Sequence, residues 1–385
     1  MRLKATQQIS PKAAAGVILG VLVLVQAFWW KGLVVKDKPP LVNGPMGGGP
    51  GPPDIGPPLL SGRENVHTDT LSGGAEPGDA DGSGTVARFD SPVGLAIDAQ
   101  SNLYVADSKN HRIRRVTPNG VTTTLAGSAP GFADGSVDKA QFQMPCGVAV
   151  APNGAVYVAD TGNHRIRRIQ DGQVTTLAGG ASGFADGQGS AVRFNMPCSI
   201  TYVGGGTPSL RIADALNKRV RILSLTGQIL GSVANPNLPT AALDDTLAIK
   251  AGLLAPGGLP KTLPIALNRL NGRPLSTSPT NPERFQIRRP LAIFPAPGGL
   301  FTIDANHNGV FYVSEGNAEL LAGRCMPASL VSGWEDHKGS RTYFGRLGGI
   351  ASDGKGHIYV CDTGNNTIRR VFLPEGWTNE RGTQP

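Results

Sequence analysis

A phrase of thirteen residues occurs three times in this chain and limits what the chain can fold into. It reads YVADSKNHRIRRV at 104–116, YVADTGNHRIRRI at 157–169 and YVCDTGNNTIRRV at 359–371. The first two copies follow an aromatic residue and a proline three places later, Phe89 with Pro92 and Phe142 with Pro145, whereas Leu347 replaces the proline before the third copy. Phe89, Phe142 and Phe194 lie 53 and then 52 residues apart. A fixed period of this length indicates one supersecondary unit repeated along the chain.

Each unit can be divided into four short strands. VGLAID and NLYVAD alternate apolar and other residues, and RIRRV and VTTTLAG supply two more short runs between turns rich in Asn, Gly and Asp. The 53 glycines and 31 prolines also favour many turns over long helices. Four antiparallel strands at a fixed period predict an all-β fold, the β-propeller, whose blades stack face to face.

The number of blades depends on one irregular region. Weaker copies of the unit are marked by Pro290 with Asp304 and by Leu347 with Asp362. Residues 240–286 keep few features of the repeat, so they are either a degenerate blade or an insertion. We therefore expect six blades of four antiparallel strands, or five if the region is an insertion. The segment 68–82 resembles 174–187 but precedes the first full unit, so we expect it to complete the last blade and close the ring.

The N-terminal part differs in composition from the repeats. Residues 1–12 form a short tail that we expect in the cytoplasm. An apolar run extends from Ala13 to Trp30, and a further apolar stretch follows Lys31. It predicts one transmembrane helix or signal anchor at 13–35, with cleavage as a signal peptide near Ala27 as the alternative. Residues 36–62 are a Pro- and Gly-rich linker. The propeller is predicted over 63–377, with a C-terminal tail at 378–385, and both readings of the N-terminus place it outside the cytoplasm.

The recurrent charges of the phrase have a structural interpretation. An aspartate ends the second strand of each unit, where its carboxylate can accept backbone N–H bonds and meet an arginine of the next strand. These aspartates are Asp107, Asp160, Asp214, Asp304 and Asp362. The arginines we expect as their partners are Arg112, Arg165, Arg219 and Arg369.

The pattern P-x-G-(I/V/L)-A-(V/I), followed by (L/V)-Y-V-A-D-x-x-N-H-R-I-R, resembles the NHL repeat. The TLAG and GFADG connectors are similar to those of bacterial NHL-repeat proteins. The resemblance is strong over 88–230 and 345–372, moderate over 288–323 and absent over 240–286. It implies a propeller of five or six blades. It implies no single function, because such propellers serve as protein-binding scaffolds, sensors, RNA binders and occasionally enzymes.

Candidate sites were weighed against structural roles. DADGSG at 79–84 has some oxygen ligands of a calcium loop but lacks the glutamate at its end, so a turn is favoured. Cys146, Cys198, Cys325 and Cys361 show no zinc spacing. No convergent catalytic set is indicated, and no cofactor is predicted. Six turn residues repeat around one rim and form a candidate binding rim: Asn110, His111, Asn163, His164, Asn306 and His307.

The chain is therefore expected to be a single-pass, membrane-anchored propeller that binds a protein, a peptide or an envelope component. The alternative is a metal-dependent propeller enzyme of the lactonase or lyase kind, which would hold Ca²⁺ or Zn²⁺ in its central channel. A third reading, RNA binding, is suggested by the net charge of +8. The expected topology makes nucleic acid an unlikely partner, and the sequence says nothing about oligomeric state.

Overall fold

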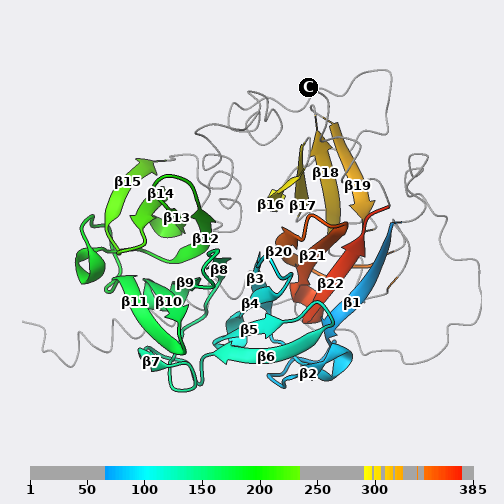
Figure 1. Cartoon of the computed structure of the whole chain (residues 1–385), viewed down its shortest axis with the longest axis horizontal. Coiled ribbons are helices and arrows are strands. Elements are labelled where there is room, and N and C mark those ends of the chain that lie inside the picture. The colour runs from blue at the N-terminus through cyan, green and yellow to red at the C-terminus, as the bar shows by residue number, and fades with distance from the viewer. Residues whose placement is uncertain are drawn as a thin grey trace, which may run out of the picture. The chain divides into compact units, whose positions relative to one another are not determined.

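The computed structural model describes residues 66–234, 290–296, 299–304, 308–314, 317–323, 336 and 342–374. These residues form an all-β propeller, and they contain five blades of antiparallel strands (Figure 1). The degenerate blade expected at 240–286 lies outside the described residues, so the choice between five and six blades stays a prediction. The same holds for the predicted membrane segment at 13–35. Within the described part of the chain, no helix is long and apolar enough to cross a membrane.

Three consecutive blades follow the period read from the sequence. The first contains β3 (Pro92–Ile97), β4 (Leu103–Asp107), β5 (Arg112–Val116) and β6 (Val121–Ala126), with the short β2 (Gly82–Ser83) on its outer edge. The second contains β8 (Gly147–Val150), β9 (Val156–Asp160), β10 (Arg165–Gln170) and β11 (Gln173–Gly179), with β7 (Gly135–Ser136) outside. The third contains β12 (Pro197–Val203), β13 (Ser209–Asp214), β14 (Arg219–Ser224) and β15 (Ile229–Ala234).

Two further blades follow residue 289. The fourth contains β16 (Pro290–Ala296), β17 (Gly299–Asp304), β18 (Gly309–Ser314) and β19 (Asn317–Ala322). The fifth contains β20 (Leu347–Ser352), β21 (His357–Asp362), β22 (Thr367–Phe372) and, outermost, β1 (His67–Gly73). Single-turn 3₁₀ helices join the second and third strands of four blades: η2 (Ser108–Asn110), η3 (Thr161–Asn163), η5 (Ala215–Asn217) and η7 (Thr363–Asn365). Two others lie in the connectors: η1 (Gly84–Val86) and η4 (Gly189–Ala191).

The prediction that the two ends share one blade is confirmed. Strand β1, from the start of the propeller, pairs antiparallel with β22, from its end, with His67 opposite Phe372 and Gly73 opposite Thr367. The pairing supplies the fifth blade with its outer strand and covers the edge that β22 would otherwise expose. Because the first and last parts of the propeller share one sheet, neither part can leave without breaking a blade.

Apolar cores lie between neighbouring blades. Buried aromatic residues occupy equivalent places at the entry to four blades: Phe89, Phe142, Phe194 and Phe344. Each contributes to a separate cluster that joins residues of two adjacent blades. A single blade cannot bury both of its faces, so this stacking supplies the core.

Candidate functional site

The buried aspartate of the repeated phrase accepts hydrogen bonds from several donors, and we call this carboxylate with its donors the clamp. Asp107 ends β4 and is fully buried; its carboxylate accepts hydrogen bonds from the Asp90 N–H at 2.8 Å and the Asn110 side-chain amide at 2.8 Å. The Arg114 guanidinium, also fully buried, donates to the same carboxylate at 2.9 Å. Burial raises the pKa of Asp107 to about 6, even though these donors favour the charged form.

The clamp repeats in three other blades. Its ion pairs join Arg167 to Asp160 at 2.8 Å, Arg221 to Asp214 at 2.8 Å and Arg369 to Asp362 at 3.1 Å. In each case both side chains are fully buried. In the fourth blade Asp304 ends β17 in the same way, but the position that corresponds to Arg114 is Phe311.

Three of the expected arginine partners were wrong. Arg112, Arg165 and Arg219 begin their strands, whereas the clamps use the arginines two places later, Arg114, Arg167 and Arg221. The two positions share a face of the strand, so the sequence pattern R-x-R does not distinguish them. Only the inner arginine packs over the buried phenylalanine of its blade, as Arg114 does over Phe89 at 5.2 Å. That packing excludes water from the ion pair, while the outer arginine stays partly exposed at the blade's end.

A second carboxylate in each clamp was not foreseen. It comes from the connector before the blade, in the ADG sequence of the first three blades, and it lies 2.6–2.7 Å from the guanidinium. These residues are Asp81, Asp134, Asp186 and, in the fifth blade, Asp336. Asp81 belongs to the segment weighed as a calcium loop, and its carboxylate accepts bonds from Arg114 and Thr124. The ADG aspartate precedes the clamp arginine by 33 residues in the first two blades and by 35 in the third, and this near-constant spacing was the available signal.

The turn residues of the phrase link one blade to the next. The His111 backbone is left-handed, with φ of 56°, and its Nδ1 accepts a hydrogen bond from the Met144 N–H at 3.0 Å. His164 binds the Met196 N–H in the same way at 3.1 Å, and in the fifth blade the Asn366 side-chain oxygen accepts from the Ser91 N–H at 3.0 Å. Burial lowers the pKa of both histidines. The neutral imidazole needed to accept these bonds is therefore favoured.

The other residues of the candidate rim are also engaged inside the protein. The Asn110 amide donates to the Gly78 carbonyl at 2.6 Å, and the Asn163 amide donates to the Gly131 carbonyl at 2.7 Å. Asn306 and His307 lie outside the described residues. In their blade the position that corresponds to His111 is Asn308, which has a left-handed φ of 44°. These contacts give the rim residues structural roles, and their role in binding stays a prediction.

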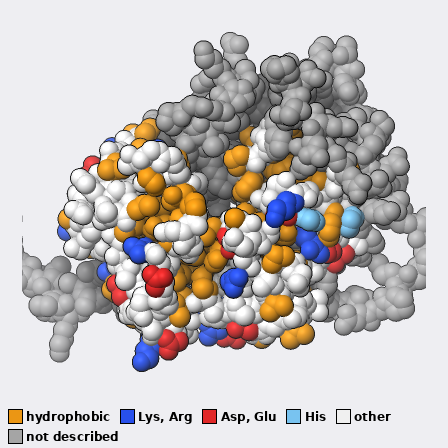
Figure 2. Space-filling view, in the orientation of Figure 1, with side chains coloured by type: hydrophobic (Ala, Val, Ile, Leu, Met, Phe, Trp, Pro, Cys, Tyr) orange, Lys and Arg blue, Asp and Glu red, His pale blue; other side chains and the backbone are white. Residues whose placement is uncertain are grey.

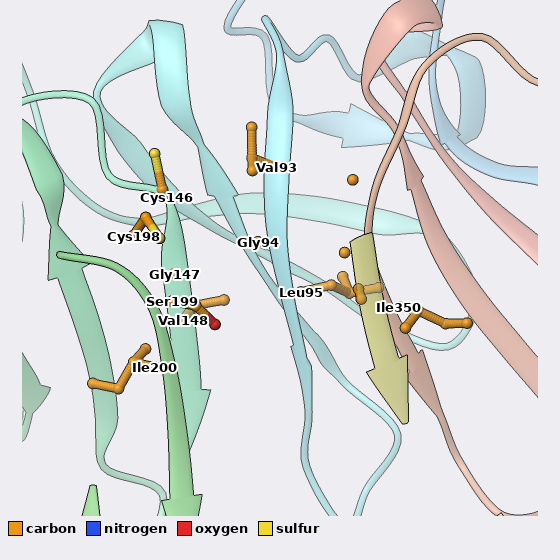
Figure 3. Close-up of a pocket in the computed structure, with 13 residues that line it drawn as sticks. Val93, Gly94, Leu95, Cys146, Gly147, Val148, Cys198, Ser199, Ile200 and Ile350 are labelled. Carbon is orange, nitrogen blue, oxygen red and sulfur yellow. The ribbon is translucent and has the colours of Figure 1, made fainter. Parts of the chain in front are cut away.

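A small, partly open pocket of about 50 Å³ lies among the innermost strands of the described blades (Figure 3). Its lining comes from the innermost strands: Val93, Gly94, Leu95, Cys146, Gly147, Val148, Cys198, Ser199, Ile200, Ala292, Gly348, Gly349 and Ile350. None of these side chains is a carboxylate or an imidazole. Across residues 66–374, so far as they are described, no three His, Cys, Asp or Glu side chains gather closely enough to hold a metal ion.

Glycine makes the innermost strands pack closely. A Cβ on Gly94 would lie 2.1 Å from the Cys146 carbonyl oxygen of the next blade, and one on Gly349 would lie 2.8 Å from the Leu95 nitrogen. The glycine of the P-x-G pattern therefore lets the backbones of neighbouring blades touch. The burial of Cys146 and Cys361 raises the pKa of both thiols, that of Cys361 to about 12, so neither is a reactive thiolate.

Comparisons with known proteins agree with the fold. The family model of the NHL repeat matches residues 89–116, 142–169 and 344–371. A curated relative, SUPPRESSOR OF QUENCHING 1 of Arabidopsis thaliana, is 37% identical over 128 residues, which is 31% of this chain and 12% of that protein. NHL repeat-containing protein 2 of Bos taurus is 44% identical over 95 residues, 23% of this chain and 13% of that protein. The chain thus spans about an eighth of these relatives.

Solved structures with a similar arrangement include two enzymes. A gluconolactonase from Xanthomonas campestris has a TM-score of 0.45 at 15% identity, and the match covers 82% of this chain and 92% of that one. An inactive variant of virginiamycin B lyase from Staphylococcus aureus has a TM-score of 0.33 at 15% identity, with 76% and 84% covered. Likenesses at this level support no statement about activity.

Proposed function

Because the chain is an NHL-repeat β-propeller, we propose that it is a binding scaffold, held at the outer face of a membrane, for a protein, a peptide or an envelope component. The observation that carries this proposal is the use of its buried charges. The buried aspartates and arginines of four blades are engaged in clamps within the fold. Their charges are therefore committed to structure rather than directed at a substrate.

The pocket among the innermost strands supports the same proposal. Its lining is aliphatic side chains, glycine, cysteine and one serine. General acid–base catalysis would need a titratable side chain within hydrogen-bond reach of a substrate, and this lining offers no carboxylate or imidazole. We therefore assign the proposed binding to the rims formed by the turns and connectors.

The N-terminal segments support the location. The apolar run within 13–35 has the length of a membrane span, and the linker at 36–62 would let the propeller stand away from the lipid. The location can be tested by treating intact cells with a membrane-impermeant amine reagent. Modification of the exposed Lys218 in intact cells is expected. Modification only after the membrane has been permeabilised would place the propeller in the cytoplasm.

Binding can be tested by photo-crosslinking of the full chain in its native membrane. A photoreactive phenylalanine analogue replaces Phe132, an exposed residue of the connector before the second blade, and in a second variant it replaces Val121, an exposed residue of β6. A scaffold is expected to give a discrete crosslinked protein from at least one position. If neither position yields a discrete product above the background without light, the scaffold proposal is wrong.

A further inference from the structure

Two phenylalanines are exposed at equivalent places in consecutive blades. Phe132 and Phe184 are 44% and 47% exposed, and both belong to GFADG connectors. The turn amides Asn163 and Asn217 hold these connectors in the same way, through the Gly131 and Gly183 carbonyls at 2.7 Å. The two rings therefore lie on the same rim of the propeller, one blade apart.

An arginine stacks on each exposed ring. The Arg165 guanidinium lies 3.7 Å from the centre of the Phe132 ring, and the Arg219 guanidinium lies 4.6 Å from the centre of the Phe184 ring. Beneath them, the clamp arginines Arg167 and Arg221 also face these rings, at 4.9 and 4.7 Å. Stacking fixes the plane of the outer guanidinium, so little side-chain freedom is lost when a carboxylate binds.

The first blade shows what this arginine position binds. There the connector carries Asp79 in place of phenylalanine, and the corresponding arginine, Arg112, forms an ion pair with it. Arg165 and Arg219 hold the same position in the next two blades, and no ion pair among the described residues involves either of them. Arg165 donates to the Asn163 carbonyl, and Arg219 donates to the Ser232 hydroxyl. The arginine position that binds a carboxylate within the first blade thus has no carboxylate partner among the described residues of the second and third blades.

Further cations lie beside these pairs. Lys218 directly precedes Arg219, and Arg193 packs against Gly183, next to Phe184. Both are exposed, and neither has an ion-pair partner within the part of the chain that the structure describes. We call this surface the aromatic–arginine rim: Phe132, Arg165, Phe184, Arg193, Lys218 and Arg219.

We propose that the aromatic–arginine rim binds an acidic segment of a partner protein, with carboxylates that reach Arg165 and Arg219 and apolar groups that cover the two rings. This inference rests on the proposed scaffold function and identifies the surface and the partner's chemistry. A continuous phosphate backbone fits less well, because the clamp residues Asp134 and Asp186 interrupt the cations in the same connectors. Their side chains are 42% and 56% exposed. Separate carboxylates on a peptide can avoid them.

The test uses the full chain in detergent and a fluorescein-labelled twelve-residue peptide of alternating Glu and Leu, with a Lys–Leu peptide as its counterpart. Binding is followed by fluorescence anisotropy. The Arg165→Gln/Arg219→Gln variant is compared with Arg115→Gln/Arg168→Gln, which removes the same charge from strands β5 and β10, where no ion pair among the described residues involves either arginine. A Phe132→Ser/Phe184→Ser variant tests the rings, and thermal melting verifies that each variant is folded.

We expect the Glu–Leu peptide to bind, the Lys–Leu peptide not to bind, and the Arg165/Arg219 variant to lose about tenfold in affinity, the effect of two exposed charge contacts. The Phe variant should also bind more weakly, and the Arg115/Arg168 variant should bind like the wild type. Equal loss in both arginine variants, or oligouridylate binding more tightly than the peptide, would overturn the proposal. If crosslinking from Val121, which lies outside the rim, still captures a partner after such a result, the scaffold function stands and only this surface is wrong.

Discussion

The Asp69 carboxylate and the Arg370 guanidinium, 301 residues apart along the chain, lie 2.6 Å from each other across strands β1 and β22. Beside them, the His67 ring stacks on Phe372 with centroids 4.0 Å apart. His357 meets the same Phe372 ring edge-on, and Figure 2 shows His, Lys and Arg side chains gathered near these strands. The closing strand is thus held by backbone pairing, by a surface ion pair and by ring contacts, which differ in their contributions.

The apolar contact of the closing strand should contribute more to the free energy of unfolding than its ion pair does. Leu71 is buried in the cluster between the fifth and first blades, so Leu71→Ala should lower the free energy of unfolding by about 2–5 kcal/mol. Asp69→Ala removes a partly exposed ion pair and should cost about 1 kcal/mol or less. Urea unfolding of both variants measures the difference. A larger cost for Asp69→Ala would show that closure depends on charge.

The two arginines of each R-x-R sequence should respond very differently to substitution. Arg114→Met leaves the Asp107 carboxylate buried without its cation, so a loss of about 3–5 kcal/mol in the free energy of unfolding is expected. Arg112→Met, the matched control on the same strand, should cost about 1 kcal/mol or less. The double variant Asp107→Asn/Arg114→Met should be more stable than additive effects predict. Additive losses would mean that the pair is not coupled.

The glycines of the innermost strands should not tolerate a methyl group. Gly94→Ala would place its Cβ 2.1 Å from the Cys146 carbonyl oxygen, and separating the two blades should cost roughly 1–3 kcal/mol or more. Gly206→Ala, where no atom lies within 4 Å of the added carbon, provides the control. Thermal melting should show a lower midpoint for the first variant alone. Equal midpoints for both variants would indicate that the innermost strands can separate without cost.

The inter-blade bond of His111 should be replaceable by asparagine. The fifth blade uses Asn366 at the same left-handed position and for the same bond to the next blade. His111→Asn should therefore keep nearly wild-type stability, whereas His111→Ala leaves the Met144 N–H without its acceptor and should lose about 1–3 kcal/mol. Chemical denaturation of the two variants separates these outcomes. If both are equally stable, the bond contributes little.

Asp353 should make stability depend on pH in the acid range. Burial by itself would raise the pKa of this carboxyl, but hydrogen bonds from the Lys355 N–H and from His357 hold the pKa below its usual value. A carboxyl with a lowered pKa in the folded state stabilises the protein fully above the unfolded value of about 4, and that contribution is lost as the pH falls through the folded pKa.

The variant Asp353→Asn isolates this effect. Its deficit in unfolding free energy relative to the wild type should be largest near neutral pH and should shrink below about pH 4. Denaturation curves at several pH values test this. A deficit that stays constant down to about pH 3 would show that the carboxylate's charge does not stabilise the fold.

Much of the architecture could be predicted because its signals are local. The alternation within VGLAID and NLYVAD identified the strands now seen as β3 and β4, and the period of the phrase placed the blades. The outer strand of the last blade was recognised because 68–82 repeats 174–187 without strands of its own before it, and β1 is that strand. The candidate rim was identified by repetition as well, but repetition by itself did not distinguish a structural role from a binding role.

The sequence by itself determined the repeating unit, its four strands and the need for the two ends to share a blade, because hydrophobic alternation and turn residues act within a few neighbouring positions. Only the tertiary structure decided which arginine meets Asp107, that Asp81 completes the clamp, and that His111 joins its blade to Met144. These choices depend on the packing of connectors and adjacent blades, which excludes water from one arginine and leaves its neighbour, two residues earlier, at the rim. Burial of this kind is a property of the assembled blades.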